Sequence, residues 1–157
     1  MENKQIYVVG NGKSLKDFDF DYLKDKEWIG CCLAFRHWET INLYPTHYVC
    51  ADIVIVKHFL EDIKSLVINK KCKTFLLTMN IIRYWKDILN YKNIHYIEHL
   101  ISFKKNPFNR LYDWCSGSSA ACYAYLLDAN IINLLGMDCN YVEFIPECEQ
   151  QSDGTLK

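Results

Sequence analysis

The alternation of short apolar runs with longer amphipathic segments is the feature that most constrains how this chain can fold. The runs are rich in Ile, Val, Tyr and Phe, and turn residues or segments with helical periodicity separate them. This pattern is typical of βα units that build a mainly parallel sheet. At 157 residues, 50% of them hydrophobic, the chain has the size and composition of one globular domain. We therefore predict an α/β fold in a single domain.

Six strands and four helices are expected from the apolar periodicity. The predicted strands are residues 5–9, 28–34, 46–51, 72–78, 94–98 and 131–135. The predicted helices are one opened by Ser14 and Asp17, one at 53–68, a weaker one at 80–89, and one at 116–128. Residues 103–114 are expected to form the longest loop.

Charge and composition exclude several classes of protein. Lys and Arg number 18 against 19 Asp and Glu, so the broad positive field that binds nucleic-acid backbones is missing. No apolar run approaches the roughly 20 residues that span a bilayer, and Met1 leads directly into polar residues, so neither a transmembrane helix nor a signal peptide is expected. The eight cysteines lie mostly in apolar segments and lack metal-binding spacing. We interpret them as reduced core residues and expect a cytoplasmic protein without a structural zinc site.

The most specific motif follows the first predicted strand. Residues 10–15 read Gly-Asn-Gly-Lys-Ser-Leu, in which Gly10 and Gly12 allow a sharp turn. Such a turn presents backbone N–H groups at a helix start, where a phosphate is favoured. Anion binding and an ordinary strand-to-helix turn are equally weighted interpretations. The motif is neither a Walker loop nor Gly-x-Gly-x-x-Gly, which disfavours P-loop kinases and standard dinucleotide oxidoreductases.

Two further segments place polar groups where parallel strands end. Ser116 and Gly117 open the last predicted helix and could hydrogen-bond a nucleotide, although taken alone they are better explained as the start of a small-residue helix. Asp138 follows the last predicted strand, where a carboxylate suits ligand hydroxyls or a base edge. Because ligands of open α/β sheets bind at the carboxyl ends of strands, these are candidate site residues.

The order and spacing of these motifs resemble a known family. Residues 6–16, 116–117 and 135–138 are similar to segments of the bacterial sialyltransferases of glycosyltransferase family 42 and of related CMP-sugar-using domains such as motility accessory factors. The resemblance implies a Rossmann-like nucleotide domain that transfers an acidic sugar from a CMP-activated donor, with inversion and without metal. It also implies nucleotide contacts from the turn at Gly10 and from Asn11, Gly12, Ser14, Ser116, Gly117 and Asp138.

The chain also departs from the family pattern. Where the family offers asparagines after its second and third strands, this chain has Cys32 and Asp52. Asn140 takes the position of a family tyrosine that assists the departing phosphate, so the neighbouring Tyr141 is the candidate catalytic substitute. The family's histidine base lies in a C-terminal region that this chain does not contain, and none of the five histidines takes its place. No general base is assigned.

Two charged segments have simpler explanations than a site. Asp19 and Asp21 form a D-x-D sequence, which holds a divalent metal in many glycosyltransferases, but their predicted place near the first helix makes the match accidental. In the long loop, a solvated surface is favoured over steering of an anionic substrate. The basic cluster of that loop consists of Lys104, Lys105 and Arg110.

The sequence thus predicts a nucleotide-binding domain at residues 1–142, followed at 143–157 by the start of a lid or acceptor region of a longer protein. The expected function is a sialyltransferase-like glycosyltransferase with a CMP-sugar donor, a glycan or protein acceptor, and no metal or cofactor. We expect a homo-oligomer in the cytoplasm, with peripheral association at the inner face of the membrane left open. The alternatives are a non-catalytic nucleotide-binding domain and a magnesium-dependent pterin pyrophosphokinase-like enzyme.

Overall fold

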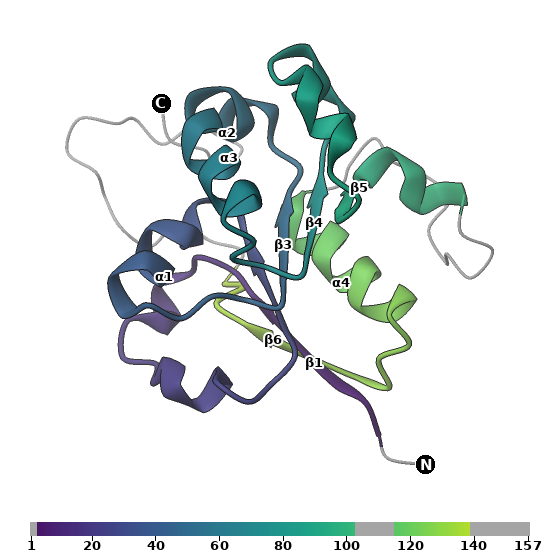
Figure 1. Cartoon of the computed structure of the whole chain (residues 1–157). Helices are drawn as coiled ribbons and strands as arrows, with labels where there is room; N and C mark the ends of the chain where they lie inside the picture. The colour runs from purple at the N-terminus through teal and green to yellow at the C-terminus, as the bar shows by residue number, and fades with distance from the viewer. Residues whose placement is uncertain (1–2, 103–114, 139–157) are drawn as a thin grey trace, which may run out of the picture.

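The computed structural model describes residues 3–102 and 115–138, which form a six-stranded sheet with helices on both faces (Figure 1). The strands are β1 (Gln5–Val9), β2 (Trp28–Cys31), β3 (His47–Cys50), β4 (Thr74–Leu77), β5 (Ile94–Tyr96) and β6 (Ile131–Leu135). They lie in the order β5-β4-β3-β2-β1-β6, and all pairings among the described strands are parallel. This Rossmann-like arrangement confirms the predicted α/β fold.

Both faces of the sheet are buried, which explains why the strands are continuous apolar runs. Along β1, Tyr7 and Val9 face a core shared with helices α1 (Phe35–Ile41), α2 (Ile53–His58) and α3 (Leu60–Ile68). Ile6 and Val8 face a second core, which packs against helix α4 (Ser116–Leu126). Figure 1 shows the same division, with α4 alone across the sheet from the other three helices.

The predicted strands 5–9 and 131–135 have the observed bounds, and the other four are shorter than predicted. The largest error is at the second strand, which ends at Cys31 because Cys32 adopts a left-handed conformation with φ +51°. An apolar run that continues past this break gives no sign of the change in backbone direction. Short 3₁₀ turns occupy Lys13–Leu15, Phe20–Leu23, Cys32–Ala34, Met79–Arg83, Lys86–Asn90 and Ile97–Ser102.

The helix predictions were partly wrong. The helix expected at 53–68 is broken into α2 and α3 at Phe59, whose φ of −115° and ψ of 32° are not helical. The weak helix expected at 80–89 is a pair of 3₁₀ turns, in which Ile81, Trp85 and Ile88 are buried. The helix expected after the Gly-Asn-Gly turn is only the 3₁₀ turn Lys13–Leu15, and α1 was not predicted.

The amino end of the sheet carries a buried polar cluster. The His47 side chain is 2% exposed, with Nδ1 2.6 Å from Thr74 Oγ1 and Nε2 3.0 Å from Glu27 Oε1. Glu27 also pairs with Lys4 at 3.2 Å, and the Thr74 hydroxyl lies 3.1 Å from that of Tyr123 in α4. The cluster therefore ties the starts of β3 and β4 to α4.

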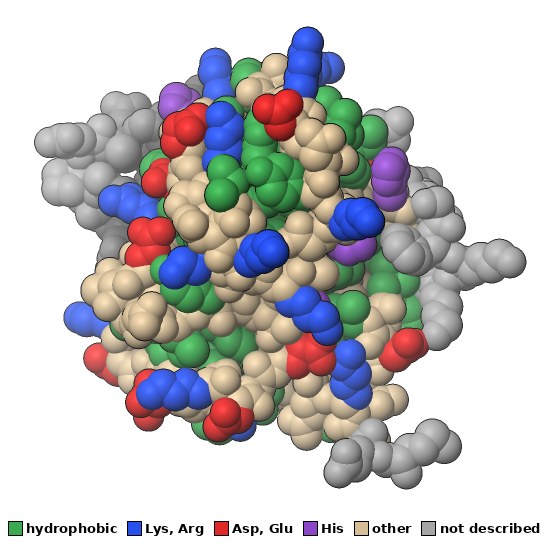
Figure 2. Space-filling model, in the orientation of Figure 1, with side chains coloured by type: hydrophobic (Ala, Val, Ile, Leu, Met, Phe, Trp, Pro, Cys, Tyr) green, Lys and Arg blue, Asp and Glu red, His purple; other side chains and the backbone are tan. Residues whose placement is uncertain are grey.

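The surface shows acidic and basic side chains interspersed over the face seen in Figure 2, in keeping with a net charge of −1. No helix in the described part of the chain is long and apolar enough to cross a bilayer.

Candidate functional site

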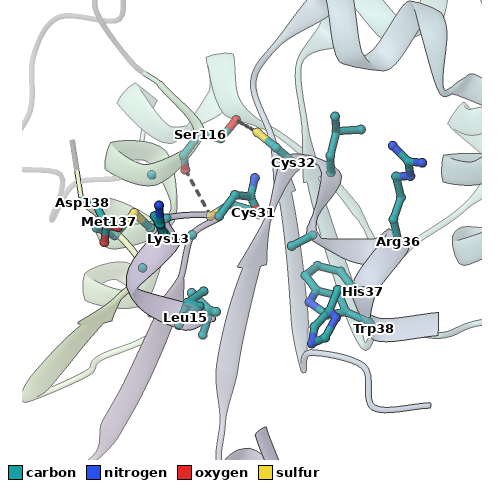
Figure 3. Close-up of a pocket in the computed structure, with 18 of the residues that line it drawn as sticks. Lys13, Leu15, Cys31, Cys32, Arg36, His37, Trp38, Ser116, Met137 and Asp138 are labelled. Carbon is teal, nitrogen blue, oxygen red and sulfur yellow. Dashed lines mark hydrogen bonds between the residues drawn. The ribbon is translucent and has the colours of Figure 1, made fainter. Parts of the chain in front are cut away.

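A cleft of about 1490 Å³ opens at the carboxyl edge of the sheet (Figure 3). The turns after β1 and β2, α1, the starts of α2 and α4, and the tip of β6 line it. Strands β2 to β5 follow one another on one side of β1, and β6 pairs with β1 on its other side. The cleft lies beside β1, where the strand order reverses. Ligands of open α/β sheets bind at such points. The cleft exceeds the roughly 300–1,000 Å³ of pockets for small ligands, so it has room for a nucleotide joined to a sugar.

Most of the predicted site residues meet in this cleft. Its lining includes Gly10, Asn11, Gly12, Cys32, Asp52, Ser116, Gly117 and Asp138. Ser14 is joined to it through hydrogen bonds to Asp138. Asn140, Tyr141, Lys104, Lys105 and Arg110 lie outside the described residues. The structure thus brings these residues together at one edge of the sheet, while the ligand-binding role of each residue stays a prediction.

The glycines of the turn after β1 allow two chain segments to approach each other. Gly10 N–H donates to the Leu135 carbonyl and Gly12 N–H to the Gly136 carbonyl, each at 2.8 Å. A Cβ atom on Gly10 would lie 2.4 Å from the Gly136 oxygen, and one on Gly12 would lie 2.4–2.6 Å from the Asp138 carboxyl atoms. The turn therefore binds the tip of β6, which accounts for both glycines without a ligand.

The Asp138 carboxylate caps this same turn. It accepts hydrogen bonds from the Ser14 hydroxyl and, at 2.9 Å, from the Ser14 N–H. These hydrogen bonds, the one from the hydroxyl foremost, hold the pKa of Asp138 below its usual range. A carboxylate thus occupies the donors that the sequence analysis assigned to a phosphate. A phosphate bound at Ser14 would meet this negative charge, so the geometry favours a phosphate position elsewhere in the cleft.

Ser116 connects three elements at the floor of the cleft. Its side chain is buried, and its Oγ accepts the Ala51 N–H and the Cys32 thiol, each at 2.9 Å (Figure 3). The Cys31 sulfur lies 3.8 Å from the Ser116 carbonyl oxygen. Ser116 therefore fixes the first turn of α4 against the ends of β2 and β3, and the adjacent Gly117 lines the cleft.

Cys115 precedes α4 as its N-cap residue. Its sulfur accepts the Ser118 N–H at 3.5 Å. Desolvation raises the pKa of Cys115, but hydrogen bonds from Ser118 and from the Gly117 N–H outweigh it, so the net shift is downward. Cys115 is exposed, so the prediction that the cysteines are core residues was wrong for this position, although all six described cysteines are free thiols.

Two predicted acidic positions serve as helix caps. Asp52 accepts the N–H groups of Val54 and Ile55, at 2.7 and 3.4 Å, at the start of α2. Asp19 accepts the Asp21 N–H at 3.0 Å, and Asp21 pairs with a lysine. The D-x-D sequence is thus part of a 3₁₀ turn. Within the described ranges, no group of three or more His, Cys, Asp or Glu side chains is arranged to hold a metal ion.

Four basic side chains of the cleft were not among the predicted site residues. Lys13, Lys16, Arg36 and His37 line the cleft, the last two from α1. Among the described residues, neither Lys16 nor Arg36 has an ion-pair partner. The apolar spacing of Phe35 and Trp38 was the available signal for α1. The lining therefore has three cations, Lys13, Lys16 and Arg36, and two carboxylates, Asp52 and Asp138. Both carboxylates accept backbone N–H groups. This excess of positive charge suits an anionic ligand.

Comparison with known proteins supports the fold. No family model matches the chain, and no curated protein matches its sequence. Its structure is similar to that of a MAf glycosyltransferase from Magnetospirillum magneticum AMB-1, with a TM-score of 0.57 and 14% sequence identity. The match covers 98% of this chain and 27% of the other, so the chain spans about a quarter of the length of that protein. At this identity the likeness shows that the two share the Rossmann-like arrangement.

Proposed function

We propose that this chain is the nucleotide-binding part of a glycosyltransferase and that the cleft binds a nucleotide-activated sugar. The observation that carries the proposal is the convergence of the β1 turn, the start of α4 and the β6 tip on one large cleft at the reversal of the strand order. The structural likeness to a MAf glycosyltransferase, which extends over 98% of this chain, supports the same class of enzyme.

The charges suggest how the donor lies. The start of α4 at Ser116 and Gly117 directs a helix N-terminus at the cleft, and Lys16 and Arg36 add positive charge, so the phosphate belongs near these groups. Asp138 retains acceptor capacity for the ribose hydroxyls or a base amino group, since Ser14 uses only part of it. Asn11 is exposed in the turn after β1 and lines the same cleft, so its amide completes the proposed nucleotide contacts.

The finer proposal is a sialyltransferase-like enzyme with a CMP-activated acidic sugar and a glycan or protein acceptor. Such a donor carries a sugar carboxylate in addition to its phosphate, and the excess of cations over carboxylates in the cleft lining suits this second negative charge. An acceptor hydroxyl attacks the anomeric carbon in line with the departing phosphate, which inverts the configuration there. Lysine and arginine side chains stabilise the leaving phosphate, so the step as proposed needs no metal. Tyr141 is retained as the proposed group that assists departure.

The domain limits and assembly belong to the same proposal. Residues 1–142 form the nucleotide-binding domain, and 143–157 begin a lid or acceptor-binding region. We also propose that the active protein is a homo-oligomer, and peripheral association with the membrane stays open.

Calorimetric titration with CMP, UMP, GDP and ATP, each with and without magnesium, tests the proposal. We expect selective binding of CMP that does not depend on magnesium. Binding of ATP only with magnesium would indicate the pyrophosphokinase class instead. Absence of binding to all four nucleotides would contradict a nucleotide site in this cleft.

The variant Asn11→Ala tests the assignment of the turn. We expect CMP affinity to fall by about tenfold, as for the loss of one hydrogen bond to a charged group. Asn90→Ala is the matched control, because Asn90 is exposed and lies outside the cleft. Equal affinities of the two variants would remove Asn11 from the site.

A further inference from the structure

Cys32 and Cys50 lie side by side at the carboxyl edge of the sheet. The register pairs Cys31 with Val49, and Cys32 and Cys50 are the residues that directly follow this last pair. Paired neighbouring strands lie about 4.8 Å apart, within the roughly 4.4–6.8 Å between the Cα atoms of disulfide-bonded cysteines, and the left-handed turn at Cys32 begins only after the last paired residue. Both side chains belong to the core on the α1 face, whereas Cys31 belongs to the core on the α4 face. Each of the two thiols shifts the pKa of the other, as expected for side chains in contact.

The two thiols differ in accessibility and reactivity. Cys32 lines the cleft and is half-buried, so a small solute can reach it, while Cys50 is buried beside it. The hydrogen bond from Cys50, with help from the Ser116 hydroxyl, lowers the pKa of Cys32 against the opposing effect of burial. The same hydrogen bond and burial raise the pKa of Cys50. Cys32 is therefore the thiol that reacts first with an oxidant. Cys50 is the adjacent thiol that then forms the disulfide with it.

We propose that Cys32 and Cys50 are a redox pair that a peroxide converts to a reversible disulfide in the floor of the cleft. The Cys32 thiol loses its proton, the thiolate attacks one peroxide oxygen, an S–O bond forms, the O–O bond breaks, and the departing hydroxide takes up that proton to form water. The Cys50 sulfur then attacks the Cys32 sulfur, an S–S bond forms, the S–O bond breaks, and the departing hydroxide takes the Cys50 proton. Two thiols lose two electrons in all, and one hydrogen peroxide becomes two waters. A small dithiol reverses the bond by exchange.

Oxidation changes the cleft through Ser116. In the reduced protein, the Cys32 thiol lies 2.9 Å from Ser116 Oγ, which also accepts the Ala51 N–H. A bond to Cys50 removes the thiol proton and draws the sulfur toward β3, so the start of α4 loses one of its two connections to the sheet through this hydroxyl. Oxidation should thus weaken ligand binding at this site, and this consequence rests on the proposed function. Formation of the disulfide does not rest on it.

Disulfide mapping tests the pair directly. The full chain is treated with stoichiometric hydrogen peroxide, the remaining thiols are alkylated, and the peptides are identified by mass spectrometry. We expect a disulfide-linked pair of peptides that contain Cys32 and Cys50. The linked pair should be missing from the Cys32→Ser and Cys50→Ser variants and present in Cys115→Ser. Treatment with a dithiol should separate the two peptides. Cys115 is the matched control because it is an exposed thiol of the same cleft. The proposal is overturned if Cys32 can still be alkylated after oxidation or if it links to another cysteine. This result is measured on the unsubstituted protein, so it does not depend on whether a variant folds.

CMP titration of the reduced and oxidised proteins separates the two proposals. We expect the oxidised protein to bind at least tenfold more weakly and the dithiol to restore affinity. A mapped disulfide with no CMP binding in either state would support the redox pair and contradict the proposed function. CMP binding without any Cys32–Cys50 disulfide would support the proposed function and contradict the redox pair. Equal affinities in the two states, with the disulfide mapped, would overturn the coupling through Ser116.

Discussion

The two ends of the sheet use polar side chains in opposite ways. At the amino end, His47, Glu27 and Thr74 are drawn into a cluster whose members satisfy one another. At the carboxyl end, Lys16 and Arg36 line an open cleft without ion-pair partners among the described residues. Burial with mutual hydrogen bonds indicates a structural role, whereas charge exposed in a concave surface indicates a ligand.

Some residues of the cleft nevertheless behave like those of the amino end. Asp138 and Ser14 bond to each other, Asp52 caps α2, and Ser116 joins two strand ends to α4. These side chains build the walls of the cleft and hold its shape. The groups that remain to recognise a ligand are the cations, Asn11, the N-terminus of α4 and the acceptor capacity of Asp138 that Ser14 leaves unused. The comparison therefore divides the predicted site into a scaffold and a binding surface, and the following variants test that division.

The largest effect is expected from His47→Ala. The substitution leaves a cavity and removes a partner from both Glu27 and Thr74, so we expect the free energy of unfolding to fall by about 3 kcal/mol. Urea denaturation measures the loss. CMP affinity of the folded protein should stay unchanged, because His47 lies at the opposite end of β3 from the cleft. A loss of affinity without a loss of stability would reverse the roles of the two ends.

The next largest effect is expected from Gly12→Ala. The φ of −68° and ψ of 154° at Gly12 suit alanine, so the cost arises from the collision of the new Cβ with the Asp138 carboxyl group. We expect the free energy of unfolding to fall by about 2 kcal/mol, as for other overpacked contacts. In an Asp138→Ala background the colliding atoms are missing, and the same substitution should cost little. An equal cost in both backgrounds would show that the two turns do not meet as described.

Much of the fold was predictable because the apolar runs report burial on both faces of a parallel sheet. β1 and β6 were placed with their correct bounds, and the other four strands were found at their predicted places with shorter bounds. The errors occur where one residue changes the backbone direction. Cys32 and Phe59 have such conformations, and neither is a glycine or proline that would reveal the change in the sequence.

The candidate site was predictable in place but not in detail. Strand ends converge at one edge of a parallel sheet, so Gly12, Ser116 and Asp138 were expected to meet there. Which donors are already occupied depends on distances between residues more than 120 positions apart, as in the bond from Ser14 to Asp138. Arg36 was missed because the helix that carries it is only seven residues long and had not been predicted.

Arg36→Ala tests the binding surface. We expect CMP affinity to fall by about tenfold at low salt and by less at high salt, because the contact is between charges at an exposed position. The free energy of unfolding should change little. Arg83→Ala is the matched control, since Arg83 is an exposed arginine outside the cleft. If both variants lose affinity equally, the effect comes from net charge and Arg36 is not a contact.

The smallest effect is the pH dependence of the amino end. Burial lowers the pKa of His47 despite its contact with Glu27, so the folded state resists protonation that the unfolded chain accepts near pH 6.5. Stability from this residue is therefore complete above that pH and is lost as the pH falls toward the pKa of the folded state. Between pH 7 and pH 6 we expect a loss of up to about 0.7 kcal/mol, measured by urea denaturation at each pH.

His47→Gln is the matched variant for this dependence, because glutamine keeps hydrogen-bonding groups but does not titrate. Burial lowers the pKa of His95 as well, so a smaller slope of the same sign should remain in the variant. Glu27 does not contribute in this range, since its pKa lies below its usual value. If the free energy of unfolding of the variant keeps the full dependence on pH, that dependence comes from other residues. The polar cluster at the amino end would then not be its source.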